Sequence, residues 1–453
     1  MIKLSIDEIL EAVNGSIYVD GKEYNYNSIE TDTRNLKNNC IFVALKGYNF
    51  NGNEFVIDAI KKGSIICIVD ELKFSESDIP KGATVIKVED TKMALLNLAE
   101  AYRKKLNIKI IGITGSTGKT STKDVTAAFL SSKFKVFKTK GNFNNEIGLP
   151  LMMFKIDESY DVAVLELGMS NFGEIHNLAK ACRPDIALIT NIGISHIENL
   201  KTRENILKAK MEITDFFSQD NTLIVNADND MLSTLNDDSY EILTTSIENN
   251  DCNIKADIIE ENLNNIVFTV IDDGEDKGTI TLPLMGIHNV ENSLLAYGAA
   301  KILGLTIDDM QKGLENLECT SMRLDVIEAH GKTIIDDSYN ASPDSMKAAL
   351  NVLKQFNGRK IAVLGTMKEL GDESKNSHKE VGEYTKKNGV EKLIVISEFE
   401  NDFKEGFGED GFYAYASIAE ARCGLDEILK DGDIILIKAS RSMHFEELVK
   451  YLK

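Results

Sequence analysis

Short apolar runs alternate with amphipathic stretches along almost the whole chain. In the first hundred residues, apolar runs at 40–45, 64–69 and 84–88 have the length and β-branched content of buried strands. The stretches between them carry apolar residues at helical spacing. The pattern predicts a small α/β domain over residues 1–105.

A larger unit follows over residues 106–316. Its predicted strands lie at 109–114, 161–167, 185–191 and 222–226. Helical segments separate these runs, which is typical of a doubly wound parallel sheet of the P-loop type. Between 241 and 284 the helical pattern lapses into alternating segments around Asp272-Asp273-Gly274, which predicts antiparallel strands appended to that sheet. The next helix is expected to start near His288.

A third α/β unit, Rossmann-like, is predicted over residues 317–453. Its strands are expected at 360–364, 392–397 and 433–438. The chain has no repeat, no Ser/Gly-rich linker and only five prolines. We therefore expect an α/β protein of three closely packed domains, with ligands bound between them.

The composition and net charge exclude some classes of binding partner. Apolar residues make up 43% of the 453 residues and charged residues 27%, as in ordinary globular proteins. A net charge of -21 opposes binding to nucleic acid or to an anionic membrane surface. No apolar run approaches the ~18 residues of a spanning helix. The six cysteines form no CxxC pair, so we expect free thiols, no membrane insertion and a cytoplasmic protein.

The segment from Thr114 to Ser121 is the strongest chemical signal. It joins a predicted strand to a predicted helix, and its glycines let backbone N–H groups converge on one anion. Lys119 adds a positive charge, and the Thr120 hydroxyl can reach a phosphate-bound Mg²⁺. Ile113 stands where the standard P-loop has its first glycine. An ordinary strand-to-helix turn is the alternative, but the Lys-Thr pair favours a phosphate site formed by Gly115, Ser116, Thr117, Gly118, Lys119, Thr120 and Ser121.

Further polar residues follow predicted strands. Glu166 ends the strand at 161–167, where open parallel sheets bind ligands, and would complement Thr120 as an Mg²⁺ ligand. His196 follows the strand at 185–191, and Lys210 lies on the next helix. Taken singly, Glu166 fits a surface residue, His196 a structural histidine and Lys210 a solvated helix residue.

Three amide or acid clusters are less specific. The turn at 141–148 carries Asn142 and Asn145, and Asn-rich turns are common for backbone reasons alone. Asn289 and Asn292 lie on one helix face and could read a nucleobase edge or simply cap the helix. Arg323 offers a guanidinium, and the run at 335–340 places acids and a ring after an apolar strand, or forms a β-turn.

The order of these motifs resembles the Mur ligase family, the ATP-dependent amide-forming enzymes of peptidoglycan precursor synthesis. The matching segments cover nearly the whole chain and are TGSTGKTS (114–121), GNFNNEIGLP (141–150), ELGMSNFGEI (166–175), TNIGISHIENL (190–200), AKMEI (209–213), GIHNVENSLLA (286–296), MRLD (322–325), DDSYNASPDSM (336–346), LGTMKELGDES (364–374) and KASRSM (438–443). Each motif alone is weak, whereas ten in order are specific.

Within the family, DDSYNASP and ELGMSNFGEI are most similar to the member that joins D-alanyl-D-alanine to UDP-N-acetylmuramoyl-tripeptide. The segments 28–34 and 41–47 fit that member's UDP-binding domain. The chain departs from its pattern in two places, with Asn51-Gly52-Asn53 for Asp-Gly-His and Lys438-Ala439-Ser440-Arg441 for Lys-Gly-Ser-Arg. The resemblance implies substrate contacts at Thr33, Arg34, Lys46, Tyr339, Asn340, Ser440 and Arg441.

The resemblance also implies a mechanism. The substrate carboxylate attacks the γ-phosphate of ATP, and the resulting acyl phosphate is attacked by the incoming amine. Lys119, Glu166, His196 and Lys210 would be catalytic. Thr120 and Glu166 would hold one Mg²⁺, and His196 with a carbamylated Lys210 would support a second.

The remaining implied roles concern the nucleotide and the assembly. Asn142 and Asn145 would lie at the nucleotide, Asn289 and Asn292 at the adenine, Arg323 at the γ-phosphate and Asp337 at the ribose. Closure of the C-terminal domain would complete the site and exclude water. The family resemblance favours a monomer.

Alternatives remain at this stage. A diaminopimelate- or lysine-adding Mur enzyme and folylpolyglutamate synthetase share the ATP motifs but differ in the outer domains. A P-loop switch or a non-catalytic nucleotide-binding partner of a cell-wall complex belongs to another class. The simultaneous presence of Lys119, Glu166, His196 and Lys210 argues against a scaffold, which needs no metal ligands.

Overall fold

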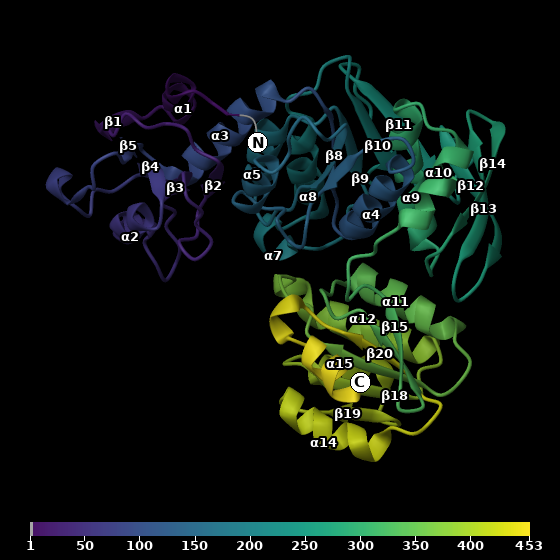
Figure 1. Ribbon diagram of the computed structural model, residues 1–453. Helices are drawn as coiled ribbons and strands as arrows, with labels where there is room; N and C mark the ends of the chain where they lie inside the picture. Colours follow the sequence, from purple (N-terminus) through teal and green to yellow (C-terminus); the bar gives the residue numbers. More distant parts are fainter. Residues whose placement is uncertain (1–2) are drawn as a thin grey trace.

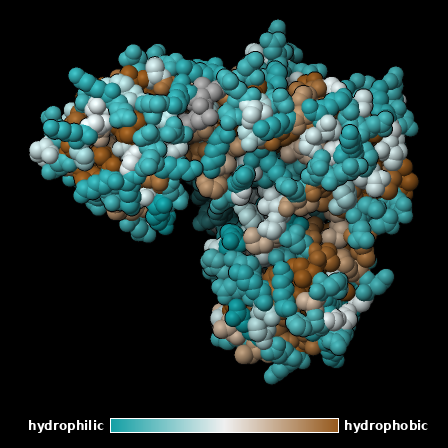
Figure 2. Space-filling view, in the orientation of Figure 1, coloured by the Kyte–Doolittle hydropathy of each residue, from teal (hydrophilic) through white to brown (hydrophobic). Residues whose placement is uncertain are grey.

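The computed structural model describes residues 3–453, which form three α/β domains. The N-terminal domain lies to one side of the central domain, and the C-terminal domain lies below it (Figure 1). Figure 2 shows a gap between the two outer domains, bounded on its inner side by the central domain. No helix within residues 3–453 combines the length and apolarity needed to cross a bilayer.

The N-terminal domain has a five-stranded sheet in the order β1-β5-β4-β3-β2. Only β1 runs antiparallel to its neighbour. The predicted strands at 40–45, 64–69 and 84–88 are confirmed as β3, β4 and β5. The elements are α1 (Ile6–Val13), β1 (Ser16–Val19), β2 (Ser28–Glu30), β3 (Cys40–Val43), α2 (Val56–Lys61), β4 (Ser64–Val69), β5 (Thr84–Lys87) and α3 (Thr91–Lys105).

The central domain has a nine-stranded sheet in the order β14-β13-β12-β11-β10-β9-β6-β8-β7. Its first half comprises β6 (Lys109–Thr114), α4 (Lys119–Leu130), β7 (Val136–Lys138), α5 (Gly148–Met153), β8 (Val162–Glu166), α6 (Glu174–Cys182), β9 (Ile186–Ile189), α7 (Ile197–Leu200) and α8 (Arg203–Met211). Its second half comprises β10 (Thr222–Asn226), β11 (Glu241–Ser246), β12 (Ile254–Glu261), β13 (Ile266–Asp272), β14 (Glu275–Leu282), α9 (His288–Ile302) and α10 (Ile307–Gly313).

Both faces of this sheet are buried, as the continuous apolar strands predict. Successive side chains of a strand point to opposite faces, so Ile110 joins the core under α5 and α6 while Ile111 joins the core under α4 and α9. The first core continues through α3 into the N-terminal domain, because α3 packs against α1 and also against α5 and α6. The two domains therefore share one hydrophobic core.

One part of the prediction for the central sheet is wrong. Antiparallel strands were expected within 241–284, but β11 runs parallel to β10, and β12 runs parallel to β11. The long connection between β10 and β11 lets the chain return to the same end of the sheet before pairing. Only β12, β13 and β14 are antiparallel, with the predicted turn at Asp273 and Gly274, whose φ angles are 50° and 78°.

The C-terminal domain has a six-stranded sheet in the order β15-β16-β20-β17-β18-β19. Only the pair β15–β16 is antiparallel, so the predicted Rossmann-like layout is confirmed. The elements are β15 (Asp325–Ala329), β16 (Lys332–Asp336), α11 (Pro343–Gln355), β17 (Lys360–Gly365), α12 (Ser374–Lys387), β18 (Lys392–Ile396), α13 (Glu400–Phe407), β19 (Phe412–Ala414), α14 (Ile418–Ile428), β20 (Ile434–Lys438) and α15 (Glu446–Leu452). Helices α11, α12 and α13 cover one face and α14 and α15 the other.

Candidate active site

A cleft of about 700 Å³ separates the central domain from the C-terminal domain. One wall is formed by the start of α4, the residues after β9 and the start of α9. The opposite wall is formed by the loops that follow β16, β17 and β20. Both walls are therefore carboxyl ends of parallel strands, where such sheets bind their ligands.

The loop between β6 and α4 needs both of its glycines. Gly115 has φ 147° and Gly118 has φ 80°, conformations that a side chain rarely adopts. A Cβ at Gly118 would come within 2.6 Å of Asn292 Oδ1, and one at Gly115 within 1.8 Å of Thr190 Oγ1. Helix α4 begins after Gly118 with no side-chain cap, which leaves its positive end available to an anion.

Thr190 and Asn191 fix this phosphate loop. The Asn191 backbone carbonyl accepts from Ser116 N (3.0 Å), its side-chain Oδ1 accepts from Thr117 N (2.8 Å), and its Nδ2 donates to Thr117 Oγ1 (2.6 Å). The Thr190 hydroxyl donates to the Thr117 carbonyl. The strand predicted to reach residue 191 consequently ends at Ile189, because the next two residues bond to the loop. The sequence alone assigned Asn191 no role, although a polar residue directly after a central parallel strand is a candidate for the ligand-binding edge of the sheet.

Lys119 is the first residue of α4 and lines the cleft. Its ammonium donates to the Gly115 carbonyl at 2.7 Å, so it lies across the mouth of the loop. Burial lowers the pKa of Lys119, and the nearby Arg323 charge acts in the same direction. Within residues 3–453 it forms no ion pair, which leaves a partly desolvated positive charge facing the cleft.

Thr120 and Glu166 lie together, as predicted for a shared metal ion. The Thr120 hydroxyl donates to the Glu166 carboxylate at 3.1 and 3.2 Å, and both residues are buried. Asn144 Nδ2 donates to Glu166 Oε1 at 3.3 Å, and Arg323 Nη2 donates to Thr120 Oγ1 at 3.1 Å. Hydroxyl and carboxylate oxygens are ligands that suit Mg²⁺. The arrangement therefore fits one hard cation beside the phosphate loop.

Lys210 is only 2% exposed, on the inner face of α8. No residue within the described 3–453 accepts a hydrogen bond from its side-chain nitrogen or forms an ion pair with it. Burial, together with the Lys119 charge, lowers the pKa of Lys210 well below its usual range. A buried lysine without a counter-ion is costly unless it is neutral or chemically modified.

His196 begins α7 in a left-handed conformation, with φ 65°. Its Nδ1 contacts the Glu369 carboxylate of the C-terminal domain, and hydrogen bonding from His196 lowers the pKa of Glu369. Thr120 and Glu166, predicted to share one ion, thus touch each other, whereas His196 faces Glu369; the second site predicted for His196 and Lys210 stays a prediction. Residues 3–453 contain no cluster of three His, Cys, Asp or Glu side chains with metal-binding geometry.

Asn289 and Asn292 lie side by side in the first turn of α9 and line the cleft. Asn292 Nδ2 donates to Asn289 Oδ1 at 3.2 Å, and Asn289 Nδ2 donates to the Met285 carbonyl at 2.8 Å. Thr122 Oγ1 donates to Asn292 Oδ1 at 3.1 Å and ties the pair to α4. Their predicted nucleobase contact stays a prediction, at a position beside the phosphate loop.

Arg323 reaches the cleft from the connection between the two domains. Met322 and Leu324, on either side of it, have φ 63° and 56°, and each left-handed non-glycine residue costs about 1 kcal/mol or more. The guanidinium lies over the Tyr339 ring at 4.4 Å, and its buried Nε has no hydrogen-bond partner. Thr320 holds this connection to α4 through two hydrogen bonds to Asp124, of 2.8 and 2.9 Å. The strained backbone therefore holds the Arg323 guanidinium, with one N–H unpaired, against the phosphate loop.

The C-terminal wall contains Asp337, Asn340, Ser440 and Arg441. Asp337 is paired with the buried Lys438, whose ammonium also donates to the Asn340 carbonyl at 2.9 Å. Ala439 stands where glycine was expected, and its methyl group lies against Gly365, where an added Cβ would come within 2.6 Å. Gly365 thus accommodates the alanine without displacing the flanking cleft residues.

The other predicted residues lie outside the cleft. Asn145 Oδ1 accepts from Gly148 N at 2.8 Å and so caps α5, and Asn142 is exposed. Arg34 is 85% exposed and paired with its neighbour Asp32 at 2.6 Å, and Thr33 lies beside it. The roles predicted for Asn142, Asn145, Thr33 and Arg34 stay predictions.

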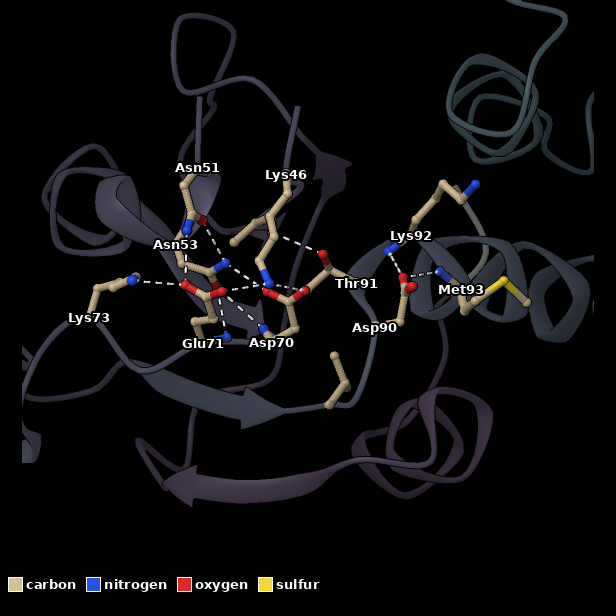
Figure 3. A network of polar contacts seen from close by, with 12 residues as sticks. Lys46, Asn51, Asn53, Asp70, Glu71, Lys73, Asp90, Thr91, Lys92 and Met93 are labelled. Atoms are coloured by element: carbon tan, nitrogen blue, oxygen red, sulfur yellow. Dashed lines mark hydrogen bonds and ion pairs between the residues drawn. The ribbon is translucent and has the colours of Figure 1, made fainter. Parts of the chain in front are cut away.

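Lys46 belongs to a polar cluster in the N-terminal domain, the Lys46 cluster, formed by Lys46, Asn51, Asn53, Asp70 and Glu71 (Figure 3). Its ammonium lies 3.0 Å from Asp70 Oδ2 and 2.8 Å from Glu71 Oε1. Asn53 is 0% exposed and donates to Asp70 Oδ1 at 2.7 Å. Lys46 is therefore already neutralised by two carboxylates, and its predicted substrate contact stays a prediction.

Comparison with known proteins decides the family. The model of the Mur ligase middle domain matches residues 113–300, and that of the Mur ligase glutamate ligase domain matches residues 322–441. These two matches cover the phosphate loop and most of both walls of the cleft. The chain belongs to the Mur ligase family.

Named Mur ligases resemble the chain over its full length. The UDP-N-acetylmuramoyl-tripeptide--D-alanyl-D-alanine ligase of Bacillus subtilis is 37% identical, covering 100% of this chain and 99% of that protein. The enzyme of the same name from Escherichia coli is 32% identical over 100% and 99%. These matches include the N-terminal domain, which the two family models do not reach.

Solved Mur ligase structures agree in all three domains. A crystal structure of MurF from Acinetobacter baumannii superimposes with a TM-score of 0.90 at 30% identity, covering 99% of this chain and 98% of that one. MurF ligase from Thermotoga maritima, solved in complex with ADP, gives a TM-score of 0.83 at 28% identity over 94% and 97%. The three-domain α/β architecture is thus that of Mur ligases.

Proposed function

We propose that this Mur ligase joins UDP-N-acetylmuramoyl-tripeptide to D-alanyl-D-alanine at the expense of ATP, in peptidoglycan precursor synthesis. The observation that carries the proposal is the convergence, in one cleft, of an uncapped helix start, Lys119, the Thr120–Glu166 pair and Arg323. Full-length similarity to ligases of that name supports the choice of substrates.

The proposed reaction has two steps. The terminal carboxylate of the tripeptide attacks the γ-phosphorus of ATP, the bond to the bridging oxygen breaks, and ADP leaves with that electron pair. The amine of the dipeptide then attacks the acyl phosphate carbon, and the tetrahedral intermediate expels phosphate as the amide forms. Positioning and charge neutralisation by Lys119, Arg323 and the start of α4 would dominate the first step.

Two magnesium ions fit different residues. Thr120 and Glu166 would hold one, and His196 with Lys210 would support the other. A magnesium ion bound there would neutralise phosphate charge. Lys210 suits carbamylation because burial favours its neutral amine, which is the form that adds to CO₂, and the resulting carbamate oxygens would replace a buried cation by an anionic ligand.

The remaining predicted residues have proposed contacts. Asn289 and Asn292 would lie at the adenine, Asp337 at the ribose, and Asn142 and Asn145 near the nucleotide. Tyr339, Asn340, Ser440 and Arg441 would receive the dipeptide, and Arg441 already lies within 5.9 Å of the Tyr339 ring.

Each domain has a proposed task. Residues 1–105 would bind the UDP moiety through Thr33, Arg34 and Lys46, residues 106–316 would bind ATP, and residues 317–453 would bind the amine and close on ATP. We also propose a monomer that binds no nucleic acid, in keeping with the net charge of -21. The exposed thiols of Cys319 and Cys423 support a reducing compartment, the cytoplasm.

A panel of amine donors tests the function. Phosphate release is measured with ATP, Mg²⁺ and UDP-N-acetylmuramoyl-tripeptide in the presence of D-alanyl-D-alanine, D-alanine, diaminopimelate, lysine or glutamate. Release is expected with the dipeptide only. Equal release without any donor would refute ligation, and release with another amine would reassign the substrate. Small-angle scattering with and without ligands tests closure, which predicts a smaller radius of gyration when all are bound.

A further inference from the structure

The segment from Thr366 to Gly371, the 366–371 loop, links β17 to the turn before α12 and forms part of the cleft wall. It also touches the central domain. The Glu369 carboxylate contacts His196 Nδ1, and the Glu369 carbonyl accepts from Glu198 N at 3.2 Å. Gly371 lies against Glu198, where an added Cβ would come within 3.2 Å of its Cα. The loop is therefore a point where the C-terminal domain docks on α7.

Three consecutive backbone N–H groups of this loop are held by side chains. Thr366 N donates to Met443 Sδ at 3.0 Å, Met367 N to His378 Nε2 at 2.9 Å, and Lys368 N to Ser440 Oγ at 2.9 Å. The acceptors come from α12 and from the segment after β20. The loop thus depends on neighbouring elements for its shape, rather than on bonds within itself.

His378 is the most constrained of these acceptors. It is 0% exposed, and its Nδ1 lies 2.6 Å from the Ser374 carbonyl, so Nδ1 carries the proton and Nε2 is left to accept. The ring stacks on Phe399, with centroids 4.5 Å apart and planes 19° apart, and meets Phe403 edge-on at 5.0 Å. Burial lowers the pKa of His378, which keeps Nε2 unprotonated and able to accept.

The conformation held in this way is an unfavourable one. Glu369 has φ 66°, in the left-handed region that costs a non-glycine residue about 1 kcal/mol or more. Such a conformation persists only where the surrounding contacts fix it on both sides. His378 and Ser440 fix the loop before Glu369, and α7 contacts it from the central domain.

We propose that His378 is a positioning residue for the ligase reaction: by holding Met367 N, it keeps the 366–371 loop in the shape that docks on α7 and completes the cleft. The inference rests on the proposed function. His378 lies outside the cleft lining, so it acts only through the loop. No other described side chain accepts from Met367 N, and a substitution that removes this acceptor frees the loop to leave its strained conformation.

The test compares three variants of the full chain. His378→Leu removes the acceptor, His378→Gln supplies an amide oxygen in its place, and Val381→Ala weakens the same buried face of α12 and leaves the His378 acceptor in place. We expect His378→Leu to lower kcat at least about 10-fold with the KM for ATP within about twofold, because misplacing a cleft wall impairs reaction geometry rather than nucleotide binding. Val381→Ala is expected to lose as much Tm as His378→Leu but to keep the wild-type kcat. His378→Gln is expected to recover most of the kcat that His378→Leu loses.

Hydrogen exchange gives a readout independent of turnover. Amides 366–368 are expected to lose protection in His378→Leu and to keep it in Val381→Ala. If His378→Leu does not fold, Met443→Leu replaces it in the test. This substitution conserves volume and removes the acceptor of Thr366 N. A kcat of Met443→Leu equal to that of the wild type would then refute the inference. Equal kcat in His378→Leu and Val381→Ala overturns the inference alone. A wild-type protein without dipeptide-dependent phosphate release overturns the proposed function as well.

Discussion

The cleft and the Lys46 cluster both gather charged side chains, but they differ in how completely these charges are paired: the cluster pairs its only lysine, whereas the cleft pairs Lys438 with Asp337 and leaves other basic groups without a counter-ion. In the cluster, Lys46 lies between Asp70 and Glu71, and Asn53 donates to Asp70. Lys119, which lines the cleft, and Lys210, which is buried on α8, form no ion pair with any residue in 3–453, and Arg323 Nε is buried without a partner. A buried basic group without a counter-ion costs free energy unless it is neutral, binds an anion or is chemically modified.

This difference in pairing distinguishes polar groups that stabilise the fold from polar groups that bind a ligand. A polar network that satisfies its own members stabilises the fold and needs no ligand. A set of cations held without partners destabilises the free protein and marks the place where an anion binds. Three substitutions test this contrast, and a fourth, at an exposed ion pair outside both regions, gives the reference for a small effect; the largest expected effect comes first.

Lys119→Met should lower kcat by about 10²- to 10³-fold, since it removes a preorganised charge from the phosphate site. Burial already lowers the pKa of Lys119, so the free protein gains nothing from the charge, and Tm should stay equal or rise. Steady-state kinetics and thermal unfolding check both halves. A fall in Tm with unchanged kcat would mean that Lys119 stabilises the fold, as the residues of the Lys46 cluster do, and does not act on the phosphate.

Lys210→Ala should lower kcat by about 10²-fold, with partial rescue by short carboxylates that replace the carbamate as an oxygen ligand. Exposed Lys208 on the same helix provides the matched control, and Lys208→Ala should be active. Depleting bicarbonate should depress the wild type but not the variant. Full activity in Lys210→Ala would remove the carbamate from the proposal.

Asn53→Ala should act on stability first. It removes the bonds to Asn51 and Asp70 and leaves Asp70 N and Glu71 N without their acceptor, which lowers the free energy of unfolding by about 1 to 3 kcal/mol. Urea unfolding measures the change. The KM for the UDP-linked substrate should change less than fivefold; a larger rise at unchanged stability would make the Lys46 cluster a binding site and break the contrast.

Asp32→Asn should have the smallest effect. The bond to Arg34 lowers the pKa of Asp32 to about 2, so its ionised form is favoured in the folded state and its contribution is lost only as the pH falls from about 4 toward 2. The pair is exposed, and its removal should change stability at pH 7 by less than about 0.5 kcal/mol. If Arg34 contacts the UDP moiety, freeing it should lower the KM for that substrate.

The pattern of apolar residues in short segments was sufficient to predict most of the strands. Runs such as 109–114 and 222–226 match β6 and β10 at both ends, because both faces of a central parallel strand are buried and must be apolar. The predicted direction of β11 was wrong, since a strand of mixed polarity looks alike in parallel and antiparallel pairing. The end of β9 was displaced by Thr190 and Asn191, whose partners lie more than seventy residues earlier in the chain.

The sequence by itself determined the three α/β domains, the phosphate loop and the order of the family motifs, because strand burial, glycine conformation and motif spacing are properties of short segments. Only the tertiary structure decided that Glu369 faces His196, that Lys438 pairs with Asp337, and that His378 holds the 366–371 loop. The first contact joins two domains, the second joins strands about a hundred residues apart in the chain, and the third joins a loop to the helix that follows it. Their distances depend on how the sheets and helices pack, which no local pattern encodes.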